Sequence, residues 1–142
     1  MNNNEIKEKI KDGALRTKVI IEVIGRPKEK IQEVTENMLK EISSEFTVLT
    51  KELAEPKEIS DKFYSAFIEA EILFPNFVSL IGFIFDRMPS SIEIIEPAKI
   101  TEDTNLMNDL MNDLAVKLHQ FSETIVKFKA MNSILKKEQK DK

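Results

Sequence analysis

The chain contains no cysteine and no tryptophan, and only one of its 142 residues is a histidine. Without cysteine there is no disulfide framework, no thiolate nucleophile and no sulfur-ligated zinc site. The single histidine, His119, excludes most metal sites that are built from imidazole ligands. We therefore expect no metal centre or covalent chemistry based on these side chains, and no cofactor.

Long apolar runs and an excess of basic residues are also missing. The longest apolar run, near NFVSLIGFIF, is too short and too interrupted to span a bilayer, and the N-terminal MNNNEIKEKIKDG lacks the apolar centre of a signal peptide. These features predict a cytoplasmic protein without membrane contact. The net charge of −4 argues against a nucleic-acid partner, because phosphate binding needs a basic stripe.

The composition is that of a soluble globular protein, with 42% hydrophobic and 32% charged residues. Short β-branched or aromatic runs predict strands, and apolar residues spaced by three and four after Pro27 predict a helix. The third strand has enough alanine and glutamate to leave a helix open as an alternative. We predict strands over 17–25, 45–56, 62–74 and 90–97, and helices over 27–42 and 75–89.

This order of elements, β-α-β-β-α-β, predicts an α+β fold of the ferredoxin-like sandwich type. In that fold two helices cover one face of a four-stranded antiparallel sheet, whose strands lie in the order 4-1-3-2. Residues 17–100 would form this domain. A polar N-terminal arm, 1–16, would precede it with one or two helical turns that end at Gly13, and 101–142 would form a long C-terminal helix with a charged tail.

Alternation along the strands supports one covered sheet face. On the first strand Val19, Ile21 and Val23 alternate with Ile20, Glu22 and Ile24. On the third strand the apolar face would carry Tyr64, Ala66, Ile68, Ala70 and Ile72, and the mixed face Ser65, Phe67, Glu69 and Glu71. In the 75–89 helix we assign Phe77, Leu80, Ile81, Ile84 and Met88 to the buried stripe, with Val78, Phe83 and Phe85 off it.

The C-terminal segment LMNDLMNDLAVKLHQF begins a helical pattern that continues without glycine or proline to about residue 139. A helix over 103–139 would span roughly 55 Å at 1.5 Å per residue. With Met111 at heptad position a, the core positions also include Asn132, whose buried amide can fix register. These seam residues are Met111, Leu114, Leu118, Phe121, Ile125, Phe128, Asn132 and Leu135.

This pattern predicts an intermolecular coiled coil, either in a homo-oligomer such as a dimer or with a helical protein partner. The pattern has flaws, since Val116, Val126 and Ile134 lie off the seam and Leu106, Leu110, Leu114 and Leu118 also form a row spaced by four. The alternative is a long helix that folds back over its own domain.

Four glutamates on the uncovered sheet face are the weak candidates for a metal site or acid-base chemistry: Glu22, Glu69, Glu71 and Glu93. The simpler interpretation, which we favour, is a solvated face with Lys18 and Lys51 as counter-charges, so we assign no metal and no catalytic residue. Phe67 on the same face could stack a nucleotide base, but the surrounding glutamates would repel phosphates.

The turn in VIGRPKEKIQEV resembles that of small-molecule-sensing ACT domains at Gly25, Arg26 and Pro27. It lacks the further glycine that lets a ligand approach the helix start, so an ordinary strand-to-helix turn is the simpler interpretation. The resemblance implies, as an alternative function, a regulatory domain that binds a small molecule at this turn.

The stretches DRMPSSIEIIEPAKI and LMNDLAVKLHQF together resemble a group of small uncharacterised archaeal proteins that join a ferredoxin-like domain to a C-terminal helix. The resemblance covers most of the chain after residue 17 and implies no activity. From the sequence we therefore expect a non-enzymatic assembly or adaptor protein that acts through its C-terminal helix.

Overall fold

All the predicted strands and helices form in the computed structural model, which describes residues 1–141. The residues divide into two compact units, Met1–Ile100 and a second unit that begins at Thr101. The elements are α1 (Asn3–Lys11), β1 (Leu15–Gly25), α2 (Lys28–Glu45), β2 (Thr47–Ser60), β3 (Phe63–Phe74), α3 (Phe77–Arg87), β4 (Ser91–Glu96) and α4 (Thr104–Lys140).

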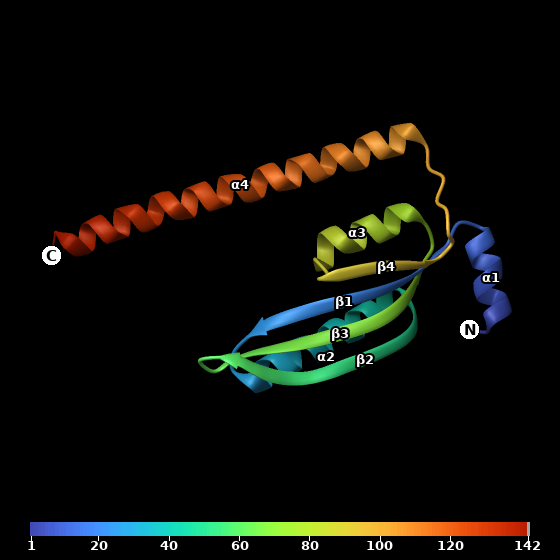
Figure 1. Cartoon of the computed structure of the whole chain (residues 1–142), viewed down its shortest axis with the longest axis horizontal. Helices are drawn as coiled ribbons and strands as arrows, with labels where there is room; N and C mark the ends of the chain where they lie inside the picture. The colour runs from blue at the N-terminus through green and yellow to red at the C-terminus, as the bar shows by residue number, and fades with distance from the viewer. Residues whose placement is uncertain (142) are drawn as a thin grey trace. The chain divides into compact units, whose positions relative to one another are not determined.

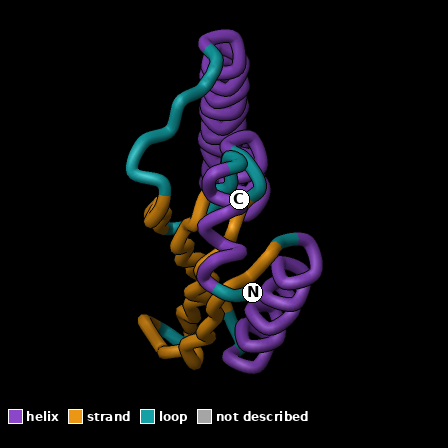
Figure 2. The backbone as a smooth tube through the Cα atoms, turned by 90° about the vertical axis from the view of Figure 1, so that its right-hand side faces the viewer, coloured by secondary structure: helices purple, strands orange, loops and turns teal. Residues whose placement is uncertain are grey.

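The sheet of the first unit has the order β2-β3-β1-β4, and every neighbouring pair is antiparallel (Figure 1). This is the predicted 4-1-3-2 arrangement read from the other edge, so the α+β ferredoxin-like fold is confirmed. Figure 2 looks along the strands and shows α2 packed beside them. Residues of α2 and α3 belong to one buried cluster with β1 and β3, which places both helices on the same sheet face.

The core of this unit lies between that sheet face and the two helices. Val19, Ile21, Ile68 and Ile72 are at most 2% exposed, as the alternation on the two central strands predicts. Three phenylalanines, Phe46, Phe74 and Phe83, meet edge to face with ring centroids 5.2 to 5.5 Å apart. Such pairs add to the gain from burial, because the positive ring edge meets the negative ring face.

The buried stripe of α3 differs from the prediction. Phe83 was expected off the stripe but is 2% exposed, whereas Met88 was expected on it but is 64% exposed. The aromatic cluster explains the first difference, because Phe83 fits against rings that come from β3 and from the end of α2. Met88 is the C-cap of α3 with φ 48° and ψ 57°, a left-handed conformation that ends the helix and turns the chain toward β4.

Strand β2 is longer than predicted, because it continues past Pro56 to Ser60. Proline cannot donate a ladder hydrogen bond and is therefore confined to edge strands and bulges. Pro56 meets both conditions, since β2 is an edge strand and its register with β3 shifts between Ala54 and Lys57.

Residues 1–16 form α1 and the start of β1. The side chain of Asn2 accepts a hydrogen bond from the backbone N–H of Glu5 and so caps α1, and the helix ends before Gly13, whose φ is +108°. Ile6 is 6% exposed and packs in a small cluster with Ala14 and Leu73. Leu73 alternates with the core residue Ile72, so α1 covers one end of the sheet face opposite α2 and α3.

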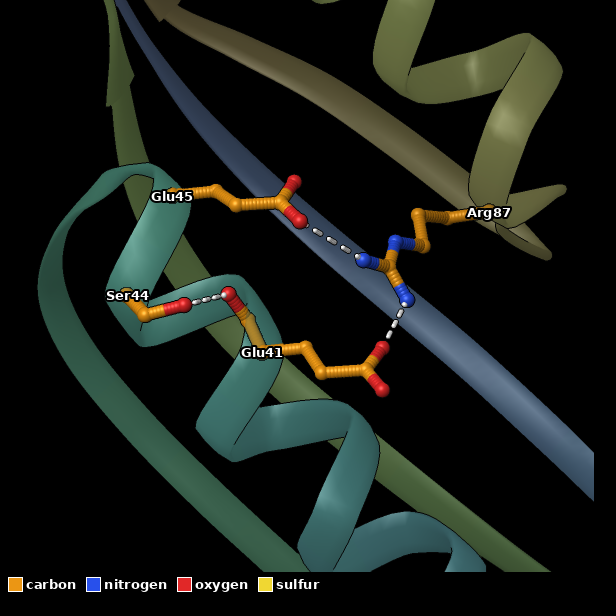
Figure 3. Close-up of polar contacts among 4 residues, drawn as sticks. All are labelled: Glu41, Ser44, Glu45 and Arg87. Atoms are coloured by element: carbon orange, nitrogen blue, oxygen red, sulfur yellow. Dashed lines mark hydrogen bonds and ion pairs between the residues drawn. The ribbon is translucent and has the colours of Figure 1, made fainter.

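Arg87, at the end of α3, ties that helix to the end of α2 (Figure 3). Its guanidinium lies 2.8 Å from a carboxylate oxygen of Glu41 and 3.5 Å from one of Glu45. The Arg87 side chain is 17% exposed, whereas those of Glu41 and Glu45 are 61% and 57% exposed, so water still reaches the carboxylate side of both ion pairs. The two contacts hold the C-terminal ends of both covering helices together.

Candidate functional site

Helix α4 is a single uninterrupted helix of 37 residues, close to the predicted 103–139. Its start is fixed by Asp103, whose carboxylate accepts a hydrogen bond of 2.7 Å from the backbone N–H of Asn105. At 1.5 Å per residue the helix is about 55 Å long. None of its described residues is buried, although Leu106, Met107 and Leu110 are half-buried.

The predicted seam residues lie on one stripe of this helix, because their alternating spacing of three and four matches the helical repeat. The apolar members keep between 43% and 62% of their surface exposed, and Asn132 is exposed as well. They are Met111, Leu114, Leu118, Phe121, Ile125, Phe128 and Leu135. Seven large apolar side chains are thus exposed side by side, which is unusual for a face that stays in water.

Apolar residues off the seam are exposed to a similar extent. Val116, Val126 and Ile134 keep 56%, 63% and 59% of their surface. They are spread over three different heptad positions, so they do not form a second stripe. His119, also off the seam, lies 3.3 Å from the carboxylate of Glu123 one turn later. A row of leucines spaced by four, Leu106, Leu110, Leu114 and Leu118, joins the seam at Leu114 and Leu118.

On the open face of the sheet, the glutamates proposed as metal candidates have polar partners from neighbouring strands. The Lys18 ammonium lies 2.6 Å from Glu69, and the Arg16 guanidinium lies 2.8 Å from Glu71. Glu71 also accepts a hydrogen bond of 3.3 Å from the Thr50 hydroxyl. Two of the four carboxylates are thus neutralised by cations rather than turned toward one another.

The other two glutamates, Glu22 and Glu93, also lie beside polar residues of neighbouring strands. Glu22 accepts a hydrogen bond of 3.0 Å from the Ser65 hydroxyl, and Glu93 lies opposite Lys18 in the ladder between β1 and β4. Glu69 raises the pKa of Lys18 above its usual value, first by a hydrogen bond and then by its charge. Within residues 1–141, no three His, Asp or Glu side chains are grouped so that they could hold a metal ion.

Arg16 was missed as a member of this face, because sequence reasoning placed it in the N-terminal arm. Strand β1 begins at Leu15, two residues earlier than predicted, and so brings Arg16 opposite Leu73 and next to Glu71. The signal that could have found it is the alternation of Arg16, Lys18 and Ile20, which continues the mixed face of β1 toward the N-terminus.

The turn after β1 lines an open cavity of about 760 Å³. Gly25 is closely packed there, since a Cβ atom would lie 2.7 Å from Cδ1 of Ile31. The Arg26 guanidinium lies over the ring of Phe63, 4.8 Å from its centroid, and the Arg26–Pro27 peptide bond is cis. The cavity is lined by Arg26, Pro27, Lys28, Glu29, Glu58, Lys62 and Tyr64.

The last three of these residues were not foreseen. Glu58, Lys62 and Tyr64 come from the β2–β3 hairpin, whose first strand was predicted to stop at residue 56. Because β2 extends to Ser60, the hairpin reaches the level of the turn after β1 and forms one side of the cavity.

In the described part of the chain, no helix combines the length and apolar character needed to cross a membrane. The first unit and the helix that follows it define an α+β protein of ferredoxin-like topology with a long C-terminal helix. The chain belongs to the MJ0538 family, whose sequence profile matches residues 16–141. That match runs from β1 through α4, so both units are part of the family and the predicted resemblance is confirmed. Among curated proteins and solved structures, nothing matches the chain significantly.

Proposed function

We propose that this protein is a non-enzymatic, cytoplasmic assembly protein that self-associates through the seam of α4. The observation that carries the proposal is the exposed seam itself, a continuous apolar stripe on a helix without a single buried residue among those described. Knobs-into-holes packing of two such stripes is the way in which heptad helices bury their a and d side chains.

The stability of α4 supports this proposal. Isolated helices are marginal in water, and most helical stability in proteins comes from packing an amphipathic face. The seam side chains expose about half of their surface, so pairing would gain on the order of 1 kcal/mol for each one that becomes buried. A second helix along the seam would thus supply packing for a helix in which no described residue is buried.

A role without catalysis is supported by the contacts that the candidate acid and base side chains make. On the open sheet face, Glu69 and Glu71 are occupied by Lys18 and Arg16. In the helical unit, His119 is exposed and its ring contacts Glu123 on its own helix. Catalytic acids and bases need a reactant within hydrogen-bond reach, whereas Glu69 and Glu71 contact cations of the neighbouring strand β1.

The test is the absolute mass of the full chain, measured by light scattering on a sizing column. We expect a dimer or larger species for the parent chain and a monomer for Leu118→Glu with Ile125→Glu, because two buried carboxylates on each chain would oppose pairing. The matched control is His119→Glu with Val126→Glu, which puts the same charges one residue further along, outside the seam. A parent chain that is monomeric at tens of micromolar would refute self-association.

The second candidate function is small-molecule sensing, and the cavity at the Gly25–Pro27 turn is what favours it. Its lining combines the cations Arg26 and Lys62 with the carboxylate of Glu58, a set that suits a zwitterion such as an amino acid. Specific binding should raise the melting temperature with ligand concentration, and Arg26→Ala should remove the effect. A panel of amino acids that leaves the melting temperature unchanged at millimolar concentration would rule this function out.

A further inference from the structure

Charge is distributed unevenly along the C-terminal unit. Between Thr101 and Val116 there are four acidic residues, Glu102, Asp103, Asp109 and Asp113, and no lysine or arginine. From Lys117 to Asp141 there are six lysines and three acidic residues. Because α4 is one continuous helix, its first third is negative and its last third is positive.

We infer that two copies of α4 pair antiparallel, an arrangement that rests on the proposed self-association and specifies its geometry. An antiparallel pair lays the acidic third of each helix along the basic third of the other. A parallel pair would lay acid along acid and lysine along lysine. Asp109 and Asp113 lie at the outer heptad positions f and c, so the charges favour the antiparallel direction through the overall field of each helix rather than through paired contacts.

The seam also specifies the register. In an antiparallel coiled coil, each a position of one helix meets a d position of the other. For two residues at the same level, one from each copy, the two residue numbers therefore add up to the same total all along the pair. A sum of 239 places Leu118 beside Phe121 of the second copy, Ile125 beside Leu114, and Met111 beside Phe128. In this register all the apolar seam residues lie within the overlap of the two helices.

The same register gives the acidic start of α4 a counter-charge. Asp103, the N-cap of α4, comes level with Lys136 of the second copy. Shifting the pair by one heptad, to a sum of 246, would carry Asp103 beyond the end of the other helix. It would also move Asn132 from the level of Met107 to that of Leu114, one layer further into the seam. The unshifted register is favoured on both grounds.

The residues that flank the seam support the antiparallel direction independently. At the g positions, Leu110 would lie beside Met131 of the second copy, so two apolar side chains extend the seam. At the e positions, Ala115 would lie beside Ser122, and their small size allows close approach. In a parallel pair, g faces e instead, and Met131 would meet the charged side chain of Lys136.

Distance measurements between nitroxide labels on the full chain test this arrangement directly. The chain has no cysteine, so a single introduced cysteine carries the only label. Three positions on the outer face of α4 share heptad position b and leave the seam intact: Asn112→Cys, His119→Cys and Ser133→Cys. In the register with a residue-number sum of 239, the two labels of a dimer are separated along the helix axis by about 23 Å at position 112, 2 Å at 119 and 40 Å at 133, at 1.5 Å per residue.

Pulsed electron–electron double resonance should therefore give the shortest distance at position 119, an intermediate one at 112 and the longest at 133. Equal distances at all three positions would mean a parallel pair, which overturns this inference and leaves self-association standing. Nearly equal long distances at 112 and 133 would mean the register shifted by one heptad, and would overturn the register.

A monomeric mass with no dipolar coupling at any position would refute the proposed function and this inference together. The control is the labelled chain that also carries Leu118→Glu and Ile125→Glu, in which the coupling at all three positions should disappear.

Discussion

Thr17 is the one polar side chain in the described residues whose buried oxygen has no hydrogen-bond partner. It lies on β1 with 0% exposure, between Ile72 of β3 and Ile94 of β4, at the point where the register with β4 shifts. Its Oγ1 therefore loses its water on folding without gaining a replacement. Such a hydroxyl costs about 1–3 kcal/mol by mutational measurements.

Valine has the shape of threonine with a methyl group in place of the hydroxyl, so Thr17→Val should remove this cost without leaving a cavity. We expect the free energy of unfolding to rise by about 1–2 kcal/mol. For a unit of about a hundred residues, each kcal/mol corresponds to roughly 4–8 °C in melting temperature. Differential scanning calorimetry of the full chain measures this, with all variants at one concentration because self-association would add its own dependence.

The control is Thr47→Val, the same change at an exposed position at the start of β2, where the hydroxyl is already solvated. This variant should change the melting temperature little. If Thr17→Val left the melting temperature unchanged or lowered it, the hydroxyl would have a partner in solution and the reasoning would be wrong.

Three further predictions concern the α+β unit. Met88→Gly should raise the melting temperature, whereas Met88→Ala should not. The reason is that the left-handed conformation at Met88 costs any residue with a side chain about 1 kcal/mol and costs glycine little. Equal melting temperatures for the two variants would refute this explanation. Arg87→Met keeps the apolar stem but removes the ion pairs to two half-exposed glutamates of α2. Calorimetry should therefore show a fall in the free energy of unfolding of no more than about 1 kcal/mol, and a smaller fall for Glu41→Gln. Because Glu69 raises the pKa of Lys18 above 10.5, the stability from this pair is present at neutral pH and lost as the pH rises through the raised pKa. The difference in melting temperature between the parent and Lys18→Met should therefore become smaller above pH 10.5. A difference that stays constant with pH would contradict a stabilising role of the Lys18–Glu69 pair.

The arrangement of the sheet could be predicted because local patterns identify each element. Alternation in β1 and β3 marks strands with one covered face, and the change to three-and-four spacing after Pro27 marks α2. Once the elements are ordered, few topologies satisfy the rules on connection and handedness, and the ferredoxin-like arrangement is one of them. The strand order and the identity of the central strands followed from this step.

Features that depend on long-range packing could not be predicted in the same way. A proline usually marks the end of a strand, and only the position of β2 at the sheet edge lets the strand continue through Pro56. Likewise, spacing alone places Phe83 on the outer side of α3, and its burial depends on Phe46 and Phe74, whose rings contact it. In both cases the deciding partner is far away in the sequence or in another element.

The two candidate sites differ in the same respect. The seam of α4 is a local pattern along one helix, so its residues could be identified from spacing alone. The cavity beside Arg26 needs the β2–β3 hairpin, and the pairing of Arg16 with Glu71 needs the register between β1 and β3. Neither can be derived from spacing within one segment, because each depends on how two distant segments align.

The length of α4 has a consequence for any assembly that it forms. In the antiparallel pair proposed here, Thr104 of each copy lies level with Leu135 of the other, so the two helix starts are about 31 residues, or roughly 46 Å, apart along the axis. Each α+β unit is joined to one of those starts through residues 97–103, so the pair would carry two identical units in one assembly. A partner that has two matching sites within reach of both units would bind them at once, and its affinity would exceed that for either unit alone.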